Sequence, residues 1–464
     1  MPDRTDSATP GSPEDGCGMG AGDGLFCSAP AECRVALATL GCKVNQVETE
    51  ALREQFALSG YRIVDFAEQA DLYIINTCAV TRMAEKKSRA LMRRAKKRNP
   101  HGLVVVTGCY GQTAQADLEK LPEVDLIIPN PDKEYLIDQI DRFLGRCDRA
   151  TVSSPHLRQV EYTFHHPRTR GFIKIQDGCE SFCSYCIVPR ARGRVRSKQP
   201  EHVLAEAQSM LDHDHRELVL SGIHLGQYGK DLDGWNLFRL VRYLLRELTG
   251  EYRIRLGSLE PNELTEELAE LVTGHPRLCN HLHIPLQSGS NVILQAMNRH
   301  YTAGQYLALL ERLHFRQPKL GLTADVMVGF PGEGDQEFKA TRHLIEESPL
   351  NDLHVFRYSQ RPGTPAAIMP HQVGEAVKNE RSQELIEVGR RQRTRFLKAL
   401  LNTDLQVLTE ENTTRGPRGL SDNYVEVLIL DPTEINRFYN VRIEKAEAGI
   451  LLGKVVGGPI PANA

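Results

Sequence analysis

Three cysteines stand close together near the middle of the chain, at Cys179, Cys183 and Cys186. Their C-x3-C-x2-C spacing follows an apolar run and a glycine, so we expect them on a loop directly after a strand. Thiolates hold iron–sulfur clusters, and a cubane with three protein ligands leaves one iron open to a small molecule. A structural zinc site would need a fourth ligand, and no Cys or His stands close by in the sequence to complete it. The trio therefore predicts an open-sided iron–sulfur cluster, with zinc or inert core cysteines as the alternatives.

Three more cysteines, Cys42, Cys78 and Cys109, are dispersed but occupy matching positions. Each follows an apolar run and a small or polar residue, in Leu-Gly-Cys42, Asn-Thr-Cys78 and Thr-Gly-Cys109. We expect all three at the carboxyl ends of parallel strands, where open α/β sheets bind ligands. Neighbouring strands lie about 5 Å apart, so loops at that edge can converge on one cluster. The alternative is that these are buried strand-end cysteines.

The segments that would position the dispersed cysteines alternate between strand and helix patterns. The expected strands are 35–40, 72–75, 103–106 and 126–128, and the expected helices lie near 46–59, 82–98 and 133–144. This alternation predicts an open parallel sheet with helices on its faces. The stretch 83–98 carries eight basic residues and one acid, which suits either a solvated surface helix or a face that contacts nucleic-acid phosphates.

A second alternating series begins at Phe172 and places the clustered cysteines after its first strand. The expected strands are 172–176, 217–220, 252–256, 281–285, 322–328 and 353–356, with helices between them. Six such units predict a barrel or partial barrel. A charged helix is expected at about 374–401. The stretch 403–458 has short apolar runs broken by Gly, Pro and Asn, which predicts a small all-β domain.

The fold class expected is therefore multidomain α/β, with an open parallel sheet, a partial (β/α)6 barrel and a small β-barrel. The expected parts are a disordered tail at 1–33, a cluster domain at 34–147, a barrel with a trailing helix at 165–400, and the β-barrel at 401–460. Cys17, Cys27 and Cys33 lie in the tail or at its edge and receive no role. Cys147 and Cys279 are expected not to be ligands.

Composition limits the function classes. The formal net charge of the 464 residues is −3, so a nucleic-acid surface must be a local patch. No apolar run approaches the roughly 18–20 residues that span a bilayer, and the first residues lack the basic and apolar segments of a secretory signal. We therefore expect a cytoplasmic protein with no membrane partner. A reducing compartment disfavours disulfides, so clustered cysteines there indicate metal binding or catalysis.

The loop Cys179-Glu-Ser-Phe-Cys183-Ser-Tyr185-Cys186 resembles the signature of the radical S-adenosylmethionine superfamily. The whole arrangement, from about residue 34 to 458, resembles the methylthiotransferase family. The stretches that carry this resemblance are Gly171-Phe-Ile-Lys-Ile-Gln-Asp-Gly-Cys179, Pro189-Arg-Ala-Arg-Gly193, His283-Ile-Pro-Leu-Gln-Ser-Gly-Ser290 and Asp325-Val-Met-Val-Gly-Phe-Pro-Gly-Glu333. The resemblance implies two [4Fe-4S] clusters, S-adenosylmethionine as cofactor, and a C-terminal barrel of the RNA-binding type called TRAM.

The residues around Cys42 distinguish the branches of this family. Lys43-Val-Asn45-Gln with Glu48 looks like the branch that modifies N6-threonylcarbamoyladenosine next to the tRNA anticodon. The implied reaction adds a methylthio group to adenine C2 by a radical route. It implies three partners: the tRNA anticodon loop, a reductant such as flavodoxin or ferredoxin, and a sulfur donor. The alternatives are a methylthiotransferase for isopentenyl-adenosine or for a ribosomal-protein aspartate, and, in another class, a non-catalytic iron–sulfur protein that binds RNA or transfers electrons.

Candidates for contacts with S-adenosylmethionine follow from the expected strand ends and from the superfamily signature. They are Tyr185, Ser221, Gly222, Ser258 and Gln287. Glycine at such an end allows the backbone to approach a ligand closely. A basic run beside the clustered cysteines, from Arg190 to Lys198, suits either phosphate or cofactor carboxylate contacts, or simple solvation.

Overall fold

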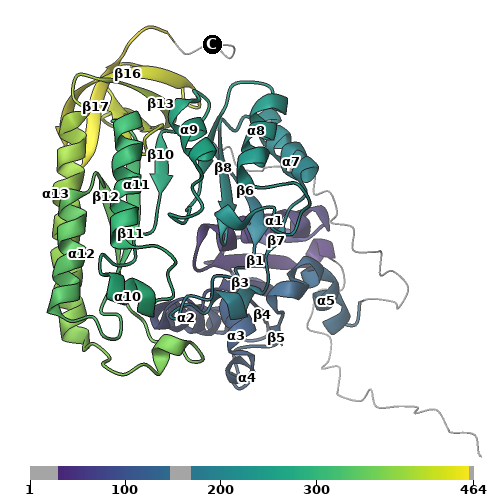
Figure 1. Cartoon of the computed structure of the whole chain (residues 1–464). Helices are drawn as coiled ribbons and strands as arrows, with labels where there is room; N and C mark the ends of the chain where they lie inside the picture. The colour runs from purple at the N-terminus through teal and green to yellow at the C-terminus, as the bar shows by residue number, and fades with distance from the viewer. Residues whose placement is uncertain (1–29, 147–168, 459–464) are drawn as a thin grey trace, which may run out of the picture.

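The computed structural model describes residues 30–146 and 169–458 (Figure 1). They form an open parallel sheet, a partial α/β barrel and a closed β-barrel, so the predicted fold class is confirmed. Residues 1–29, which include Cys17 and Cys27, lie outside the described residues, as does Cys147. Pro30–Glu32, which the sequence placed in the tail, forms a short 3-10 helix before the first strand.

The N-terminal sheet has the order β2-β1-β3-β4-β5 and is parallel throughout. Its strands are β1 (Arg34–Thr39), β2 (Arg62–Val64), β3 (Leu72–Thr77), β4 (Leu103–Gly108) and β5 (Leu126–Ile127). Every residue of β3 and β4 is buried because helices cover both faces, which explains their unbroken apolar runs. The helices are α1 (Lys43–Leu58), α2 (Arg82–Arg98), α3 (Cys109–Thr113), α4 (Gln115–Leu118) and α5 (Leu136–Phe143).

The sequence reading missed β2. This edge strand is short, and only Val64 in it is buried, so it lacks the apolar run by which the other strands were recognised.

The partial barrel has the parallel strands β6 (Arg170–Asp177), β8 (Glu217–Gly222), β9 (Arg253–Leu256), β10 (His281–His283), β11 (Gly321–Val328) and β12 (Asp352–Arg357). They lie in two sheets, and the short antiparallel β7 (Arg196–Ser197) flanks β6. Isolated bridges, such as Ser258 to His283, join the sheets. The longer helices are α7 (Pro200–Asp212), α8 (Leu237–Glu247), α9 (Glu266–Gly274), α11 (Ala303–Arg316), α12 (Asp335–Glu347) and α13 (Glu375–Ala399), and the short ones are α6 (Val188–Arg192) and α10 (Asn291–Ala296).

Alternation along β6 separates the two faces of the barrel wall. Ile173 and Ile175 belong to the core that the strands share with the surrounding helices. Phe172 and Lys174 therefore point to the opposite, inner side of the barrel. The same rule places His283 and Asp325 on the inner side, because Leu282 and Ala324 belong to that core.

The C-terminal barrel is closed in the order β13-β14-β15-β17-β16. Its strands are β13 (Asp404–Thr413), β14 (Gly416–Ser421), β15 (Glu426–Ile429), β16 (Phe438–Glu447) and β17 (Ile450–Val455). It covers the amino ends of β8 and β9: Arg253 donates to the Leu420 carbonyl at 2.8 Å, and Arg255 to the Ser421 carbonyl at 3.1 Å. Both arginines also hold the fully buried Glu217.

None of the helices in the two described ranges combines the length and the apolar character that a membrane crossing requires.

Candidate cluster sites

The first trio, Cys42, Cys78 and Cys109, gathers at one edge of the N-terminal sheet. Cys42 caps α1, Cys78 follows β3, and Cys109 begins α3 directly after β4. Because β1, β3 and β4 are parallel neighbours, their carboxyl ends meet at the same edge. Burial and the neighbouring thiols of Cys109 and Cys42 raise the pKa of Cys78 to about 11. The expected convergence of these cysteines is therefore present.

Two glycines keep the edge open around these sulfur atoms. Gly41 has a φ of 114°, and a Cβ there would lie 3.1 Å from the Cys78 Sγ. Gly108 has a φ of 92°, and its Cβ would lie 2.4 Å from the Thr77 carbonyl oxygen. Both conformations are ones that glycine adopts readily, and neither position has room for a side chain.

The second trio, Cys179, Cys183 and Cys186, lies on the loop between β6 and α6 (Val188–Arg192). Gly178 opens the loop with a φ of 76°, and a Cβ there would lie 1.8 Å from the Arg194 carbonyl oxygen. Within the loop, the Cys186 N–H donates to the Cys183 carbonyl at 3.0 Å. The relative positions of these three cysteines are thus set by the conformation of one loop.

Both trios have hydrogen-bond donors aimed at sulfur. In the first trio, Arg192 Nε donates to Cys109 Sγ at 3.4 Å. In the second, Arg299 Nη1 donates to Cys183 Sγ at 3.4 Å, and the His224 ring lies 3.2 Å from Cys179 Sγ. Donors of this kind stabilise thiolates that ligate a cluster.

The spacing of the sulfur atoms bears on the zinc alternative. Among the described residues, the groups of three donor atoms within 4.8 Å of one another do not include either trio. A single tetrahedral ion with metal–sulfur bonds of about 2.3 Å would hold three thiolates closer than this. A cubane binds each thiolate at a different iron, so it suits the wider spacing. The donor set therefore fits iron–sulfur clusters better than zinc.

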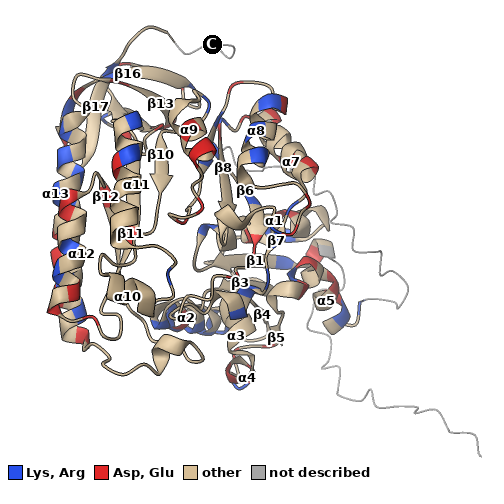
Figure 2. Cartoon of the chain, in the orientation of Figure 1, with Lys and Arg blue, Asp and Glu red and all other residues tan. Residues whose placement is uncertain are grey.

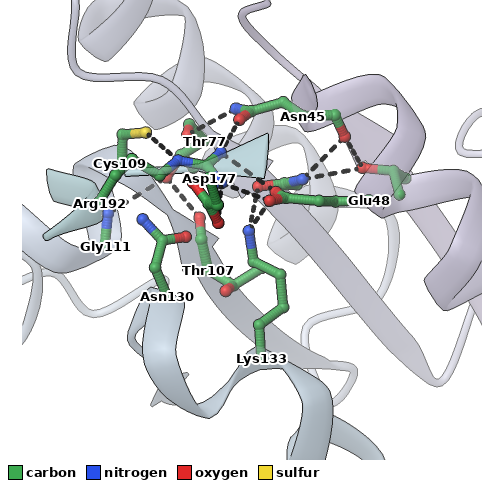
Figure 3. Close-up of polar contacts among 12 residues, drawn as sticks. Asn45, Glu48, Thr77, Thr107, Cys109, Gly111, Asn130, Lys133, Asp177 and Arg192 are labelled. Carbon is green, nitrogen blue, oxygen red and sulfur yellow. Dashed lines mark hydrogen bonds and ion pairs between the residues drawn. The ribbon is translucent and has the colours of Figure 1, made fainter. Parts of the chain in front are cut away.

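Arg192 of the barrel contacts Cys109 and other residues of the N-terminal domain (Figure 3). Its guanidinium donates to Asn45 Oδ1 at 2.5 Å, lies 3.3 Å from Asp177 Oδ2, and forms an ion pair with Glu48. Arg192 follows the second trio in sequence yet touches Cys109 of the first. The N-terminal sheet and the barrel are therefore joined at their cysteine-bearing edges.

Glu48 is the anionic centre of this junction. Burial alone would raise its pKa, but Lys174, Lys133 and Arg192 together hold it well below its usual range. Lys174 and Lys133 approach the Glu48 carboxylate to 2.7 and 2.6 Å. The Glu48 carboxylate thus stays ionised at neutral pH with cationic partners on several sides, as a buried charge between two domains requires.

The second trio has its own charged neighbours. Burial lowers the pKa of His224, but hydrogen bonds to Cys179 and Glu263 raise it to about 10. Burial likewise opposes ionisation of Cys179, yet the hydrogen bond from His224 keeps the Cys179 pKa below its ordinary value. A protonated His224 beside the sulfur favours a thiolate ready for iron.

The residues predicted to contact S-adenosylmethionine lie where the sequence placed them, at strand ends or in the cysteine loop. Ser221 and Gly222 end β8, and Ser258 and Gln287 follow β9 and β10. The ring of Tyr185 packs edge-on against Phe330 with centroids 6.4 Å apart. The role of these five residues in binding the cofactor stays a prediction.

Other cysteines lie apart from both trios. Cys33 is buried in the core beside β1, and Cys279 is buried near Glu217. That Cys279 is not a ligand stays a prediction.

One polar group on the inner barrel face was missed. His283, Asp325 and His354 come from β10, β11 and β12, and one donor atom of each lies within 4.8 Å of the others. His283 Nε2 lies 3.2 Å from Asp325 Oδ1, and His354 Nδ1 lies 3.4 Å from the same oxygen. No short-range motif joins these residues. The inward alternation along β11 is the signal that could have found them.

Two family models match this chain, and each matched region contains one of the two cysteine trios. Residues 34–129 match a model described as uncharacterized protein family UPF0004, and residues 173–345 match the Radical SAM superfamily. Among solved structures, the radical S-adenosylmethionine methyltransferase TsrM from Kitasatospora setae has a similar fold, with a TM-score of 0.54 and 16% identity over 72% of this chain and 75% of that one. Fold and motif together define a radical S-adenosylmethionine enzyme.

Similar proteins of known activity show which group of radical S-adenosylmethionine enzymes this chain belongs to. The chain is 40% identical to the threonylcarbamoyladenosine tRNA methylthiotransferase MtaB of Bacillus subtilis, over 89% of this chain and 94% of that protein. It is 35% identical to the MtaB of Aquifex aeolicus, over 88% and 100%. A tRNA-2-methylthio-N(6)-dimethylallyladenosine synthase of Thermoanaerobacter pseudethanolicus is 32% identical over 90% and 92%. The chain belongs to the tRNA methylthiotransferase family, in its MtaB branch.

Proposed function

We propose that this protein adds a methylthio group to C2 of N6-threonylcarbamoyladenosine next to the anticodon of tRNA. The observation that carries the proposal is the pair of cysteine trios at the carboxyl edges of two parallel sheets, joined through Arg192. Each trio lies in one of the two matched family regions. The 40% identity to the MtaB of Bacillus subtilis, against 32% to the dimethylallyladenosine synthase of Thermoanaerobacter pseudethanolicus, favours the threonylcarbamoyl substrate.

In this proposal each trio holds a [4Fe-4S] cluster, and the second also leaves an iron for S-adenosylmethionine. When bound, these groups supply the radical and the sulfur that substitution at an aromatic C–H needs, since that bond offers no acidic proton. Tyr185, Ser221, Gly222, Ser258 and Gln287 remain our candidates for cofactor contacts. The domain limits 34–147, 165–400 and 401–460 also remain part of the proposal.

The chain's own residues hold these groups in place. Arg192 and Arg299 each donate to one thiol and bind a carboxylate, Glu48 and Glu260 respectively. Each guanidinium is thus fixed by a second partner while it stabilises a thiolate. The two sites therefore share one feature, an arginine that is paired with a carboxylate and donates to a cysteine sulfur.

We assign the RNA contact to α2, which begins shortly after Cys78. Figure 2 shows Lys and Arg along this helix. Five of its exposed cations form no ion pair with any residue in the described part of the chain; they are Lys86, Lys87, Arg93, Arg94 and Lys97. Cations that lack protein partners are available to phosphates. The interpretation as a phosphate-contacting face is thereby favoured over that of a merely solvated helix.

The second basic helix, α13, differs. Its Arg390, Arg391 and Arg393 pair with Glu387, Glu346 and Asp352. Because these charges already have carboxylate partners, we do not assign α13 to the RNA surface.

The remaining partners follow from the reaction. A reductant such as flavodoxin or ferredoxin and a sulfur donor are part of the proposal, as is a cytoplasmic location. None of them has a contact site that we assign.

The proposal is tested by mass spectrometry of tRNA nucleosides from a strain that lacks this protein. We expect 2-methylthio-N6-threonylcarbamoyladenosine to disappear and its unmethylthiolated precursor to accumulate, with both reversed by the wild-type gene. Selective loss of the methylthio form of isopentenyl-adenosine would favour the alternative substrate. Unchanged nucleosides in a strain with no redundant enzyme, together with no 5′-deoxyadenosine from reduced protein, would favour a non-catalytic iron–sulfur protein.

A further inference from the structure

A cluster of two histidines and one aspartate, without a cysteine, lies on the inner side of the barrel. His283, Asp325 and His354 come from the neighbouring parallel strands β10, β11 and β12. Asp325 is directly opposite His354 in the register of β11 and β12, and Leu353 and Val355 pack against the core on the other face. The three polar side chains therefore share the face of the sheet that lines the barrel interior.

The distances between the donor atoms of this cluster are close to those around a single metal ion. Asp325 Oδ1 lies 3.2 Å from His283 Nε2 and 3.4 Å from His354 Nδ1, and one donor atom of each residue lies within 4.8 Å of the others. Nitrogen and oxygen ligands of a tetrahedral zinc ion, with bonds of about 2.0–2.1 Å, lie about 3.3–3.4 Å from one another. A cation thus fits between these atoms after small adjustments of the side chains.

The surroundings of the cluster also suit a metal site. His283 Nδ1 lies 2.9 Å from the Thr323 hydroxyl, a contact that fixes the ring and directs Nε2 toward Asp325. Metal-binding histidines almost always have such a hydrogen-bond partner on their second nitrogen. Among the described residues, Asp325 forms ion pairs with these two histidines and with no lysine or arginine. No permanently charged side chain of the described ranges therefore competes with a metal ion for its carboxylate.

We propose that His283, Asp325 and His354 bind one divalent transition-metal ion such as Zn²⁺. Two imidazoles and one carboxylate are a ligand set that zinc and ferrous ions accept in proteins. The side chain of His354 is 61% exposed, so an ion can reach the site from solvent. Three protein ligands leave a position open for water or for an oxygen atom of a molecule inside the barrel. This site is additional to the two clusters and does not depend on the identity of the substrate.

The test measures zinc binding to the full chain after anaerobic reconstitution of both clusters, which occupy the cysteines of the trios. Equilibrium dialysis against Zn²⁺, followed by elemental analysis, should give about one zinc ion per chain. His283→Ala and His354→Ala should each weaken zinc binding about 100-fold, since a ligand matters at least as much as its outer-shell partner. His343→Ala, at an exposed histidine of α12 that pairs with Glu347, is the matched control and should leave zinc binding unchanged. An iron content of about eight atoms per chain checks that each variant holds both clusters.

X-ray absorption at the zinc edge identifies the ligands in wild-type protein and needs no variant. The proposed site predicts nitrogen and oxygen ligands at about 2.0–2.1 Å and no sulfur at about 2.3 Å. Zinc bound through sulfur would mean that it had entered a cysteine trio, and would overturn the proposal.

Two results of the dialysis would also overturn the metal site. They are the absence of retained zinc in wild-type protein, and equal zinc binding by wild-type protein and His354→Ala. The two histidines would then only share hydrogen bonds with Asp325. Neither result would affect the proposed reaction, which is tested separately on tRNA nucleosides.

Discussion

The two cysteine trios hold sulfur atoms in similar chemical surroundings but are built in opposite ways. The second lies within eight residues of one loop, and its geometry depends on Gly178 and local turns. The first spans Cys42 to Cys109, and its geometry depends on the register of β1, β3 and β4. One site is encoded locally, whereas the other exists only after the sheet has formed. The division of labour between them can therefore be tested by changes that affect one trio at a time.

Loss of a ligand should give the largest effect. Cys183→Ala should abolish formation of 5′-deoxyadenosine, because the open iron is lost with its cluster. Cys78→Ala should retain this activity and lose methylthio transfer. Both products are measured by mass spectrometry after reduction with dithionite in the presence of S-adenosylmethionine. Comparable loss of cofactor cleavage in both variants, each still folded, would contradict the division of labour.

Substitution of the glycines should remove one cluster at a time. Gly108→Ala places a Cβ against the Thr77 carbonyl, and Gly178→Ala places one against the Arg194 carbonyl. Each change should reduce bound iron from about eight to about four atoms per chain. Only Gly178→Ala should abolish formation of 5′-deoxyadenosine. Gly274→Ala is the control, since a Cβ there meets no atom within 4 Å and should leave the iron content unchanged.

Substitutions in the basic helix α2, next to the first trio, should have a smaller effect, which appears in tRNA binding. Replacing Lys86, Lys87 and Arg93 of α2 by alanine should weaken tRNA binding and lower the slope of log affinity against log salt by about 3. The same replacements at Arg390, Arg391 and Arg393 of α13 should change the slope little, because those charges are paired. Anisotropy titrations at several salt concentrations measure both. A larger change from α13 would place the RNA on the other helix.

The donors to sulfur should give the smallest and most selective effect. Arg192→Lys keeps the charge near Glu48 and loses the planar fork that reaches Cys109, so the midpoint potential of the first cluster should fall. Arg299→Lys should lower the potential of the second cluster instead. Redox titrations followed by electron paramagnetic resonance distinguish them. An equal shift of both clusters in either variant would mean that the two sites are not electronically separate.

The same contrast explains what the sequence could predict. The second trio was predicted from its spacing, and the first from its repeated position at strand ends together with the family resemblance. The contacts of Arg192 with Asn45 and Glu48 could not be read in this way, because 147 and 144 positions separate the partners. The sequence suggested only that the basic run at 190–198 contacts phosphates, a cofactor carboxylate or solvent. At Arg192 its described partners are instead protein groups, because two separate sheets fold against each other there.

The buried ion pairs of Glu217 with Arg253 and Arg255 constrain any study of the C-terminal barrel. Truncation at about residue 400 would remove the carbonyl acceptors of Arg253 and Arg255 and expose both guanidinium groups to water. It would also expose the buried carboxylate of Glu217, with which both arginines pair. Impaired activity in such a shortened enzyme would then report damage to the radical domain as well as weaker RNA capture. The C-terminal barrel is thus part of the packing that keeps the amino ends of β8 and β9 buried, and its removal is not a neutral change.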